Sequence, residues 1–372
     1  LKGLIVAAIL APLVIEALRR TVGNVLVLVT LGFLAYGLLG QLIPGELQGR
    51  PLKLDQLLYY IVWDGGSMLG TPVLVASTIV IAFVLFGFLL FESGGSDFFT
   101  DVSLALMGRY RGGSAKIAIT ASGLFGSISG SAVSNVMSTG VITIPLMRQG
   151  GYRAQTAGAI EAVASTGGQL MPPVMGAAAF LMAEFLQVPY SDVVLAALLP
   201  AILYYYALFI QADLIAAKEG ISRVPEDKIP VILTVLRNGW HYPLPFVALI
   251  GGMFYMNWSP QMAALAGSAV LMVSGFVLGY GGKRMSWAGA LRAVIQTGQT
   301  SLDMMAITAA AGFIIGVLNV SGLGFSLTYV LVTIGGGNVW LLLFISAIVC
   351  VILGMGMPTV GVYVLLATLV AP

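Results

Sequence analysis

The chain has 372 residues, of which 59% are hydrophobic and only 9% are charged, and its formal net charge is +2 at pH 7. Soluble domains carry about 25% charged residues, so this composition excludes a water-soluble protein and predicts one embedded in a lipid bilayer. The small net charge gives no basis for a nucleic-acid partner. The single cysteine excludes a disulfide framework.

Long apolar segments predict transmembrane helices, because crossing ~30 Å of hydrocarbon takes about 20 mostly apolar residues. In chain order, such segments lie near 21–43, 68–91, 190–212, 240–257, 261–280 and 296–320, with a shorter one at 4–18. Three other apolar regions are interrupted by Gly, Ser and Pro: 114–147, 154–187 and 338–372. Interrupted backbone at membrane depth needs protein or water to satisfy its polar groups, so we expect the function to reside in these regions.

Basic residues predict the orientation of the chain. Arg109 and Arg111 precede the interrupted region 114–147, and Arg148 and Arg153 follow it. The positive-inside rule places both flanks in the cytoplasm, which predicts a re-entrant hairpin. On the same count, region 338–372 approaches from the opposite side of the membrane.

The two halves of the chain are similar at an offset of 228 residues. The pairs in register are Ser93-Gly94 with Ser321-Gly322, Gly126 with Gly354, and Ser131 with Thr359. Since the orientation count runs the two halves in opposite directions, we expect an inverted repeat of the kind found in secondary transporters. The expected domains are N-terminal helices and a linker at 1–58, a first transport repeat at 59–237 and a second at 238–372. Both chain ends fall within apolar stretches, so we expect an internal piece of a longer polypeptide that continues with another broken segment.

Two interrupted stretches indicate a binding site. Residues 123–140, "GLFGSISGSAVSNVMSTG", combine glycines, which free backbone carbonyls, with hydroxyls, and neutral oxygens of this kind suit a hard cation such as sodium. Residues 161–176, "EAVASTGGQLMPPVMG", contain a diproline that ends one half-helix and starts another. Packing of small residues between helices is the alternative for the first stretch. Two breaks in one half favour a site, so we expect the hairpin tip and the broken helix to meet.

The stretches "GSISGSAVSNVMSTGVITIPLMRQGGY", "ASTGGQLMPPVMGAAAFLMAEF" and "GMGMPTVGVYVLLATLVAP" resemble the large membrane subunit of tripartite ATP-independent periplasmic (TRAP) transporters. They are most similar to the TAXI branch, in which the small and large membrane subunits are fused. The resemblance covers residues 60–372 and implies an all-α integral membrane fold, an inverted-repeat, elevator-type transporter with two re-entrant hairpins and broken helices. It implies a location in the cytoplasmic (inner) membrane of a bacterium or archaeon.

The resemblance also implies a function and partners. The chain would import organic acids of the dicarboxylate or 2-oxo acid class, delivered by a periplasmic substrate-binding protein and driven by a Na⁺ or H⁺ gradient. The small membrane subunit would be fused on the N-terminal side, and no cofactor is expected besides the coupling ion. The implied first cation site consists of Ser129, Ser131, Ser134, Asn135, Ser165, Thr166 and Gly168. The implied second site starts from Gly354, Gly356 and Thr359, but the family's second broken helix is absent from this chain, which leaves that site half represented.

Acidic residues inside the spans are further candidates, because a charge at the bilayer centre costs ~2.5–3.5 kcal/mol on the insertion scale. Glu161 lies one helical turn before Ser165, and Asp303 lies in the other half of the repeat. We expect both to act in coupling or on the substrate path, together with Gln169 and Pro172. A structural pairing of Glu161 with a basic residue or a hydroxyl is the alternative.

Other function classes are less well supported by the sequence. In "GSISG" the position of a hydrolase nucleophile is occupied by Ile128, and His241 follows Trp240 at a predicted span start, where an interfacial role is expected. No phosphate-binding loop of an ATP-driven pump occurs. We therefore expect a transporter rather than an enzyme. A passive channel for small anions is the remaining alternative, although hairpins from opposite faces favour alternating access.

Overall fold

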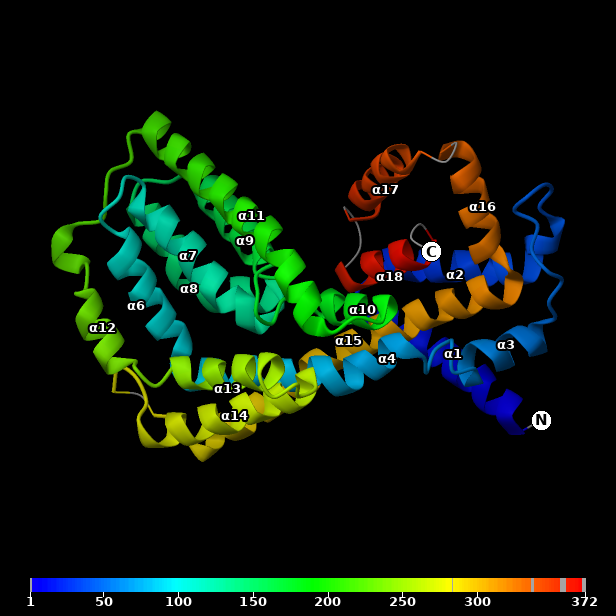
Figure 1. The fold of residues 1–372 in the computed structure, drawn as a ribbon, viewed down its shortest axis with the longest axis horizontal. Helices are drawn as coiled ribbons and strands as arrows, with labels where there is room; N and C mark the ends of the chain where they lie inside the picture. Colours follow the sequence, from blue (N-terminus) through cyan, green and yellow to red (C-terminus); the bar gives the residue numbers. More distant parts are fainter. Residues whose placement is uncertain (1, 283, 336–337, 355–358, 370–372) are drawn as a thin grey trace. The chain divides into compact units, whose positions relative to one another are not determined.

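The computed structural model describes residues 2–282, 284–335, 338–354 and 359–369. Its elements in this part of the chain are helices (Figure 1). Five of them are long and apolar enough to cross a membrane: Asn24–Leu42, Thr71–Glu92, Tyr190–Glu219, Pro260–Val277 and Trp287–Ser321. The predicted class, an all-α integral membrane protein, is confirmed.

The chain forms two compact units. Unit 1 contains residues 1–78, 184–186 and 299–372, and unit 2 contains residues 79–183 and 187–298. Two long helical segments have residues in both units, namely Thr71–Glu92 and α15 (Trp287–Ser321). Within Thr71–Glu92, α4 (Thr71–Val75) and α5 (Ile81–Glu92) are joined by a π-helical turn at Ala76–Val80.

Unit 1 packs around the C-terminal part of α15. Its other helices are α1 (Lys2–Thr21), α2 (Asn24–Leu39), α3 (Leu54–Trp63), α16 (Leu323–Gly335), α17 (Val339–Gly354) and α18 (Thr359–Leu369). Phe313 and Val317 of α15 are fully buried against Leu57 and Ile61 of α3. Ser67 lies in the turn between α3 and α4, and this turn packs against α15 at Gly316. A Cβ atom on Gly316 would lie 2.3 Å from the Ser67 Oγ, so only glycine lets the turn approach α15 so closely.

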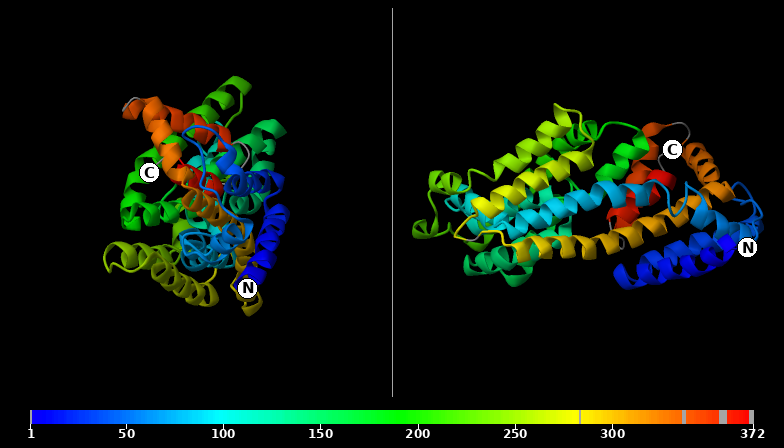
Figure 2. Two further views of the ribbon diagram at one scale, coloured as in Figure 1. Left: turned by 90° about the vertical axis from the view of Figure 1, so that its right-hand side faces the viewer. Right: turned by 90° about the horizontal axis from the view of Figure 1, so that it is seen from below.

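Unit 2 holds both interrupted regions of the first half. The hairpin consists of α7 (Gly113–Ser129) and α8 (Ala132–Gln149), and the broken helix consists of α9 (Ala154–Gly167) and α10 (Ala177–Leu186), whose last three residues belong to unit 1. Around them lie α6 (Gly95–Met107), α11 (Tyr190–Glu219), α12 (Ile232–Asn238), α13 (Pro243–Phe254) and α14 (Pro260–Val277). Helices α13 and α14 lie side by side in every view (Figures 1 and 2).

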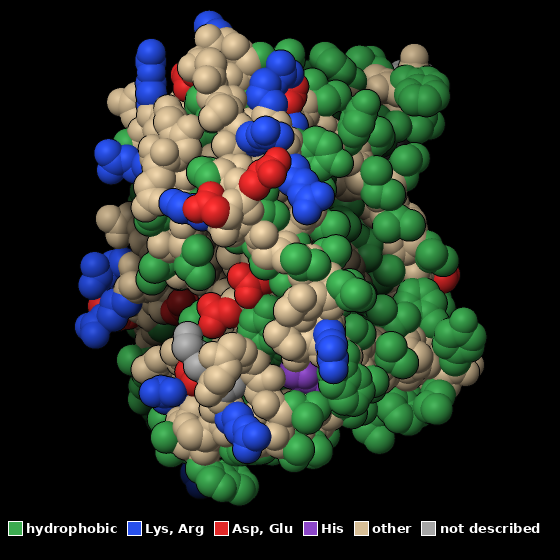
Figure 3. Space-filling view, turned by 90° about the vertical axis from the view of Figure 1, so that its left-hand side faces the viewer, with side chains coloured by type: hydrophobic (Ala, Val, Ile, Leu, Met, Phe, Trp, Pro, Cys, Tyr) green, Lys and Arg blue, Asp and Glu red, His purple; other side chains and the backbone are tan. Residues whose placement is uncertain are grey.

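Several helix ends meet at one end of unit 2, which is rich in basic residues. Ala115, Met147 and Ile221 pack there in one buried cluster, and the Lys116 Nζ donates to the Asp213 Oδ1 at 2.6 Å. Burial raises the pKa of Tyr152, in the turn after α8, to about 12, so its hydroxyl stays neutral. Lys and Arg side chains gather in the upper part of the face shown in Figure 3. The exposed basic residues near these helix ends are Arg109, Arg111, Arg148, Arg153, Lys218 and Arg223.

Both ends of the α7–α8 hairpin therefore lie at this basic end, with the tip away from it. This is the arrangement that the basic flanks predict. Re-entry of the hairpin from the cytoplasmic face stays a prediction.

The boundaries of two helices repeat at the offset found in the sequence. α6 (Gly95–Met107) and α16 (Leu323–Gly335) begin and end 228 residues apart. Each follows a glycine in the left-handed region, Gly94 with φ 88° and Gly322 with φ 78°. Glycine adopts this conformation without the steric cost of a Cβ atom, so the matched pair supports the internal repeat. The inversion of the repeat and its boundaries at 58 and 237 stay predictions.

Candidate functional site

The hairpin tip contacts the break in the neighbouring helix. α7 ends at Ser129, Gly130 turns the chain with φ 61°, and the Ser131 Oγ accepts a hydrogen bond from the Ser134 backbone N–H at 3.3 Å to cap α8. Between α9 and α10 the chain leaves helical geometry, and the Val174 N–H donates to the Ser127 carbonyl at 3.0 Å. The expectation that tip and break meet is confirmed.

Glycines permit this contact. A Cβ atom on Gly168 would lie 2.5 Å from the Gly126 Cα, and one on Gly130 would lie 2.4 Å from the Met175 carbonyl oxygen. Real Cβ atoms do not approach backbone so closely, and the backbone cannot move aside as a flexible side chain could. The glycines of both stretches are therefore needed for packing as well as for the breaks.

A fully buried carboxylate lies behind the tip, between the hairpin and α9. Glu161 has no exposed surface. Its Oε1 accepts hydrogen bonds from the hydroxyls of Ser122 at 2.9 Å, Thr139 at 2.6 Å and Ser165 at 3.1 Å. Its Oε2 accepts one from the Thr143 hydroxyl at 2.6 Å. Of the two pairings open to Glu161 in the sequence, the structure shows the one with hydroxyls, and we call these five residues the Glu161 cluster.

The hydroxyls of α8 also have backbone acceptors within reach. The Thr139 Oγ1 lies 2.9 Å from the Asn135 carbonyl oxygen, and the Thr143 Oγ1 lies 2.9 Å from the Thr139 carbonyl oxygen. A hydroxyl carries a single proton and can point it to either acceptor by rotation. The cluster can therefore solvate an ionised Glu161, and its two threonines keep a backbone acceptor if the carboxylate binds a proton or a sodium ion instead.

Asn135 joins the three helices of the site. Its side chain is fully buried, and its Nδ2 lies 2.8 Å from the Ser122 carbonyl oxygen on α7 and 3.5 Å from the Ser165 carbonyl oxygen on α9. Since Asn135 lies on α8, one amide group connects both arms of the hairpin to the broken helix.

The remaining residues of the predicted first site have different surroundings. The Ser129 Oγ is buried without a hydrogen-bond partner among the described residues. Thr166 is exposed, and its hydroxyl donates to the Ala162 carbonyl at 2.7 Å. Within the break, the Gln169 carbonyl accepts from the Gly176 N–H at 2.8 Å, and Pro172 is partly buried. The cation-binding role of the set stays a prediction.

The predicted second site falls in unit 1. Gly354 ends α17 and Thr359 begins α18, while Gly356 lies outside the described residues. Asp303 is exposed on α15, also in unit 1, whereas the Glu161 cluster belongs to unit 2. The second cation site and a role for Asp303 therefore stay predictions.

Sequence reasoning did not single out three hydroxyls of the Glu161 cluster. Thr139 and Thr143 are four residues apart, which places them on one face of α8, and that spacing could have identified them. Ser122 lies just outside the quoted hairpin stretch, and no local pattern marks it, because only the hairpin fold brings α7 against Glu161.

Comparisons with known proteins agree with the resemblance. Residues 9–372 match the family described as Tripartite ATP-independent periplasmic transporter, DctM component. The sialic acid TRAP transporter permease protein SiaT of Haemophilus influenzae is 27% identical over 227 residues, which are 61% of this chain and 36% of that protein. The C4-dicarboxylate TRAP transporter large permease protein DctM of Pseudomonas aeruginosa is 26% identical over 290 residues, 78% of this chain and 66% of that protein.

A third relative, the 2,3-diketo-L-gulonate TRAP transporter large permease protein YiaN of Escherichia coli, is 24% identical over 231 residues, 62% of this chain and 53% of that protein. The chain thus spans between about one third and two thirds of the length of these curated relatives. The family match extends over nearly the whole chain and includes the hairpin, the broken helix and the Glu161 cluster. This multi-pass membrane protein therefore belongs to the family of DctM components of tripartite ATP-independent periplasmic transporters.

Proposed function

We propose that the chain is the large membrane subunit of a secondary active transporter that imports organic acids by alternating access. Its curated relatives are named for sialic acid, C4-dicarboxylates and 2,3-diketo-L-gulonate, which are all organic acids. On this proposal a periplasmic binding protein delivers the substrate to the inner membrane. A small membrane subunit, fused on the N-terminal side as in the TAXI branch, completes the complex.

The observation that carries the proposal is the Glu161 cluster. Among the described residues, the hydrogen bonds to this fully buried carboxylate come from neutral hydroxyls, so its ionised form has a large desolvation cost, which a bound cation would reduce. We propose that a proton or a sodium ion binds there and couples its gradient to transport. The position supports this role, because Ser165 and Asn135 link the cluster to the hairpin tip and the break, and the same elements would move in an elevator step.

Counterflow tests the proposal against a passive channel. The full-length transporter is reconstituted in proteoliposomes that are loaded with unlabelled succinate, 2-oxoglutarate or sialic acid. Labelled acid is then added outside, with the binding protein present. An alternating-access transporter exchanges the two pools and transiently accumulates label, whereas a channel shows no such accumulation.

A further inference from the structure

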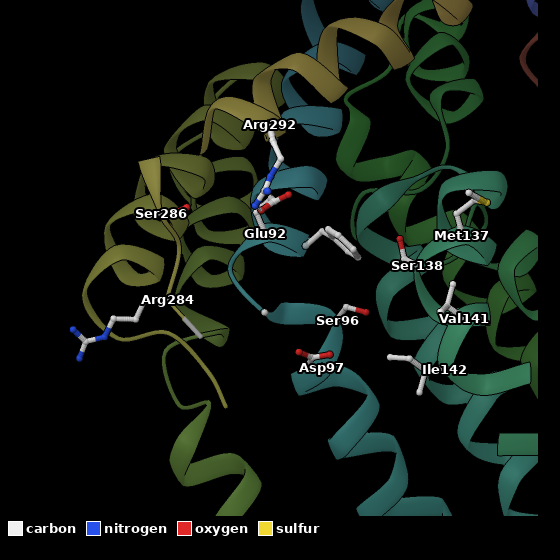
Figure 4. Close-up of a pocket in the computed structure, with 12 residues that line it drawn as sticks. Glu92, Ser96, Asp97, Met137, Ser138, Val141, Ile142, Arg284, Ser286 and Arg292 are labelled. Carbon is white, nitrogen blue, oxygen red and sulfur yellow. Dashed lines mark hydrogen bonds and ion pairs between the residues drawn. The ribbon is translucent and has the colours of Figure 1, made fainter. Parts of the chain in front are cut away.

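A cavity of about 510 Å³ lies within unit 2, lined by residues outside the Glu161 cluster (Figure 4). Three segments line it: the junction of α5 and α6, one face of α8, and the residues that lead into α15. Its volume falls in the range of ~300–1,000 Å³ that is typical of sites for small organic molecules.

The start of α6 supplies hydrogen-bond donors to this cavity. α6 begins after Gly94 without a side-chain cap, so the N–H groups of Gly95 and Ser96 have no partner within the helix and lie at its positive end. Ser96 is only 6% exposed, and its Oγ has no hydrogen-bond partner among the described residues. In Figure 4 this side chain points toward α8 across the cavity. An unpaired buried hydroxyl is destabilising, and a hydrogen bond to a ligand oxygen would remove that cost.

An ion pair occupies the opposite wall. The Arg292 guanidinium donates from Nη2 to the Glu92 Oε2 at 3.0 Å, and Arg292 is 63% exposed while Glu92 is 12% exposed. This guanidinium therefore already binds a carboxylate at the cavity wall. The lining also includes Asp97, in the first turn of α6, and Arg284, which points away from the cavity in Figure 4. Asp97 therefore adds a second carboxylate, which, like Glu92, weakens the binding of an anion there.

The third wall is apolar and lies along the hairpin. Met137, Val141 and Ile142 present hydrocarbon from α8. Ser138, on the same wall, is two helical turns beyond the tip residue Ser131, about 10 Å along the axis. Ser138 therefore lies between the tip and the basic end of α8, which is predicted to be cytoplasmic. A substrate that leaves the tip toward the cytoplasm would pass it.

We propose that this cavity is a release site for the transported organic acid. The ligand's carboxylate binds the first N–H groups of α6, the Ser96 hydroxyl and the Arg292 guanidinium, and its carbon chain packs on Met137 and Val141. Arg292 exchanges the Glu92 carboxylate for that of the ligand, so Glu92 competes with the ligand and keeps its binding weak enough for release. This inference rests on the proposed function and adds a second position for the same substrate.

Protection of an introduced cysteine tests the site directly. Ile142→Cys is made in the full-length transporter with Cys350→Ser and any other cysteines replaced, and labelling by a membrane-impermeant thiosulfonate is timed in detergent. Succinate, 2-oxoglutarate and sialic acid are the probes, and uncharged succinamide is the control ligand. Leu233→Cys, an exposed position on α12 away from the cavity, is the control site.

The acid that gives counterflow should slow labelling at position 142 and leave position 233 unchanged. Ser96→Ala and Arg292→Gln should each raise the half-protecting concentration about tenfold, the worth of one hydrogen bond to a charged group. Glu92→Gln should lower it several-fold, because the competitor is removed. If the ion pair were purely structural, Glu92→Gln and Arg292→Gln would change the half-protecting concentration in the same direction. That result would overturn the inference.

The remaining outcomes separate this inference from the proposed function. Counterflow without protection at position 142 overturns the release site and leaves the transport function standing. Absence of both counterflow and protection contradicts both. Protection without counterflow supports the anion site and contradicts the transport function.

Discussion

The substitution Glu161→Gln removes the charge of the Glu161 cluster and keeps its hydrogen-bonded packing. The glutamine amide can keep its oxygen at the position of Oε1, where Ser122, Thr139 and Ser165 donate. Its NH₂ group then replaces Oε2, whose donor among the described residues is Thr143. The Thr143 hydroxyl can turn to the Thr139 carbonyl at 2.9 Å and accept from the amide. Every polar group keeps a partner, so the variant should fold.

The energetic consequence follows from these contacts. Hydrogen bonds to a charged group contribute about 1.5–3 kcal/mol and neutral ones about 0.5–1.5 kcal/mol, but the variant also escapes the desolvation cost of a buried charge. These effects oppose one another, so the midpoint of thermal unfolding should shift by no more than a few degrees. Thr143→Val, in contrast, leaves the Oε2 of an ionised carboxylate without a donor and should destabilise the protein by about 1–3 kcal/mol.

The assay is uptake of labelled acid by proteoliposomes that hold the full-length transporter, with a pH gradient and a sodium gradient imposed separately. If protons couple transport, Glu161→Gln mimics the protonated state, abolishes accumulation and retains exchange. Glu219→Gln, at the basic end of unit 2, is the matched control and should behave as wild type. Wild-type accumulation by Glu161→Gln under both gradients would refute the role of this carboxylate.

Three further predictions follow from named contacts. Gly168→Ala should lower the thermal unfolding midpoint, by the equivalent of about 1–3 kcal/mol, because its Cβ atom would lie 2.5 Å from the Gly126 Cα. The control is Gly158→Ala inside α9, which has nothing within 4 Å and should keep or slightly raise the midpoint, since alanine favours a helix over glycine. A midpoint for Gly168→Ala equal to that of Gly158→Ala would contradict the close approach. In unit 1, Gly316→Ala should destabilise the protein, because the new Cβ atom would lie 2.3 Å from the Ser67 Oγ. Gly298→Ala, also on α15, has nothing within 4 Å and is the unhindered control, and thermal denaturation of the two purified variants compares their stabilities. If sodium couples transport, Ser131→Ala and Ser165→Ala should each raise the sodium concentration for half-maximal uptake, and an unchanged sodium dependence in both would remove these hydroxyls from the coupling site.

The fold could be read from the sequence where local composition determines it. Uninterrupted apolar stretches predicted α11 and α15, and the glycines and prolines of 161–176 predicted the break between α9 and α10. α6 was not predicted, because Asp97 and Asp101 lower its hydropathy and its stability comes from packing in unit 2. His241 is buried in the protein, with its ring 4.4 Å from that of Tyr242, while the neighbouring Trp240 is exposed, and the interfacial position of His241 stays a prediction.

The site was predicted in its parts but not in its geometry. Gly126 and Gly168 come from separate stretches, and only the fold shows that their backbones touch. Glu161 was identified because a carboxylate is costly in an apolar segment, yet its partners Ser122 and Thr143 could not be assigned, since hydroxyls on either arm of a hairpin are equivalent in sequence. The local sequence thus identifies residues that are unusual in an apolar span, and only the tertiary contacts show which groups they bind.

The most direct test of ion-coupled transport is accumulation against a concentration gradient. The full-length transporter and its binding protein are placed in proteoliposomes, and internal labelled succinate, 2-oxoglutarate or sialic acid is measured after a sodium or pH gradient is imposed. We predict that the internal concentration of at least one acid rises above the external one, and that the rise disappears when an ionophore collapses the driving gradient. Uptake that stops at equal concentrations under both gradients would contradict ion-coupled transport.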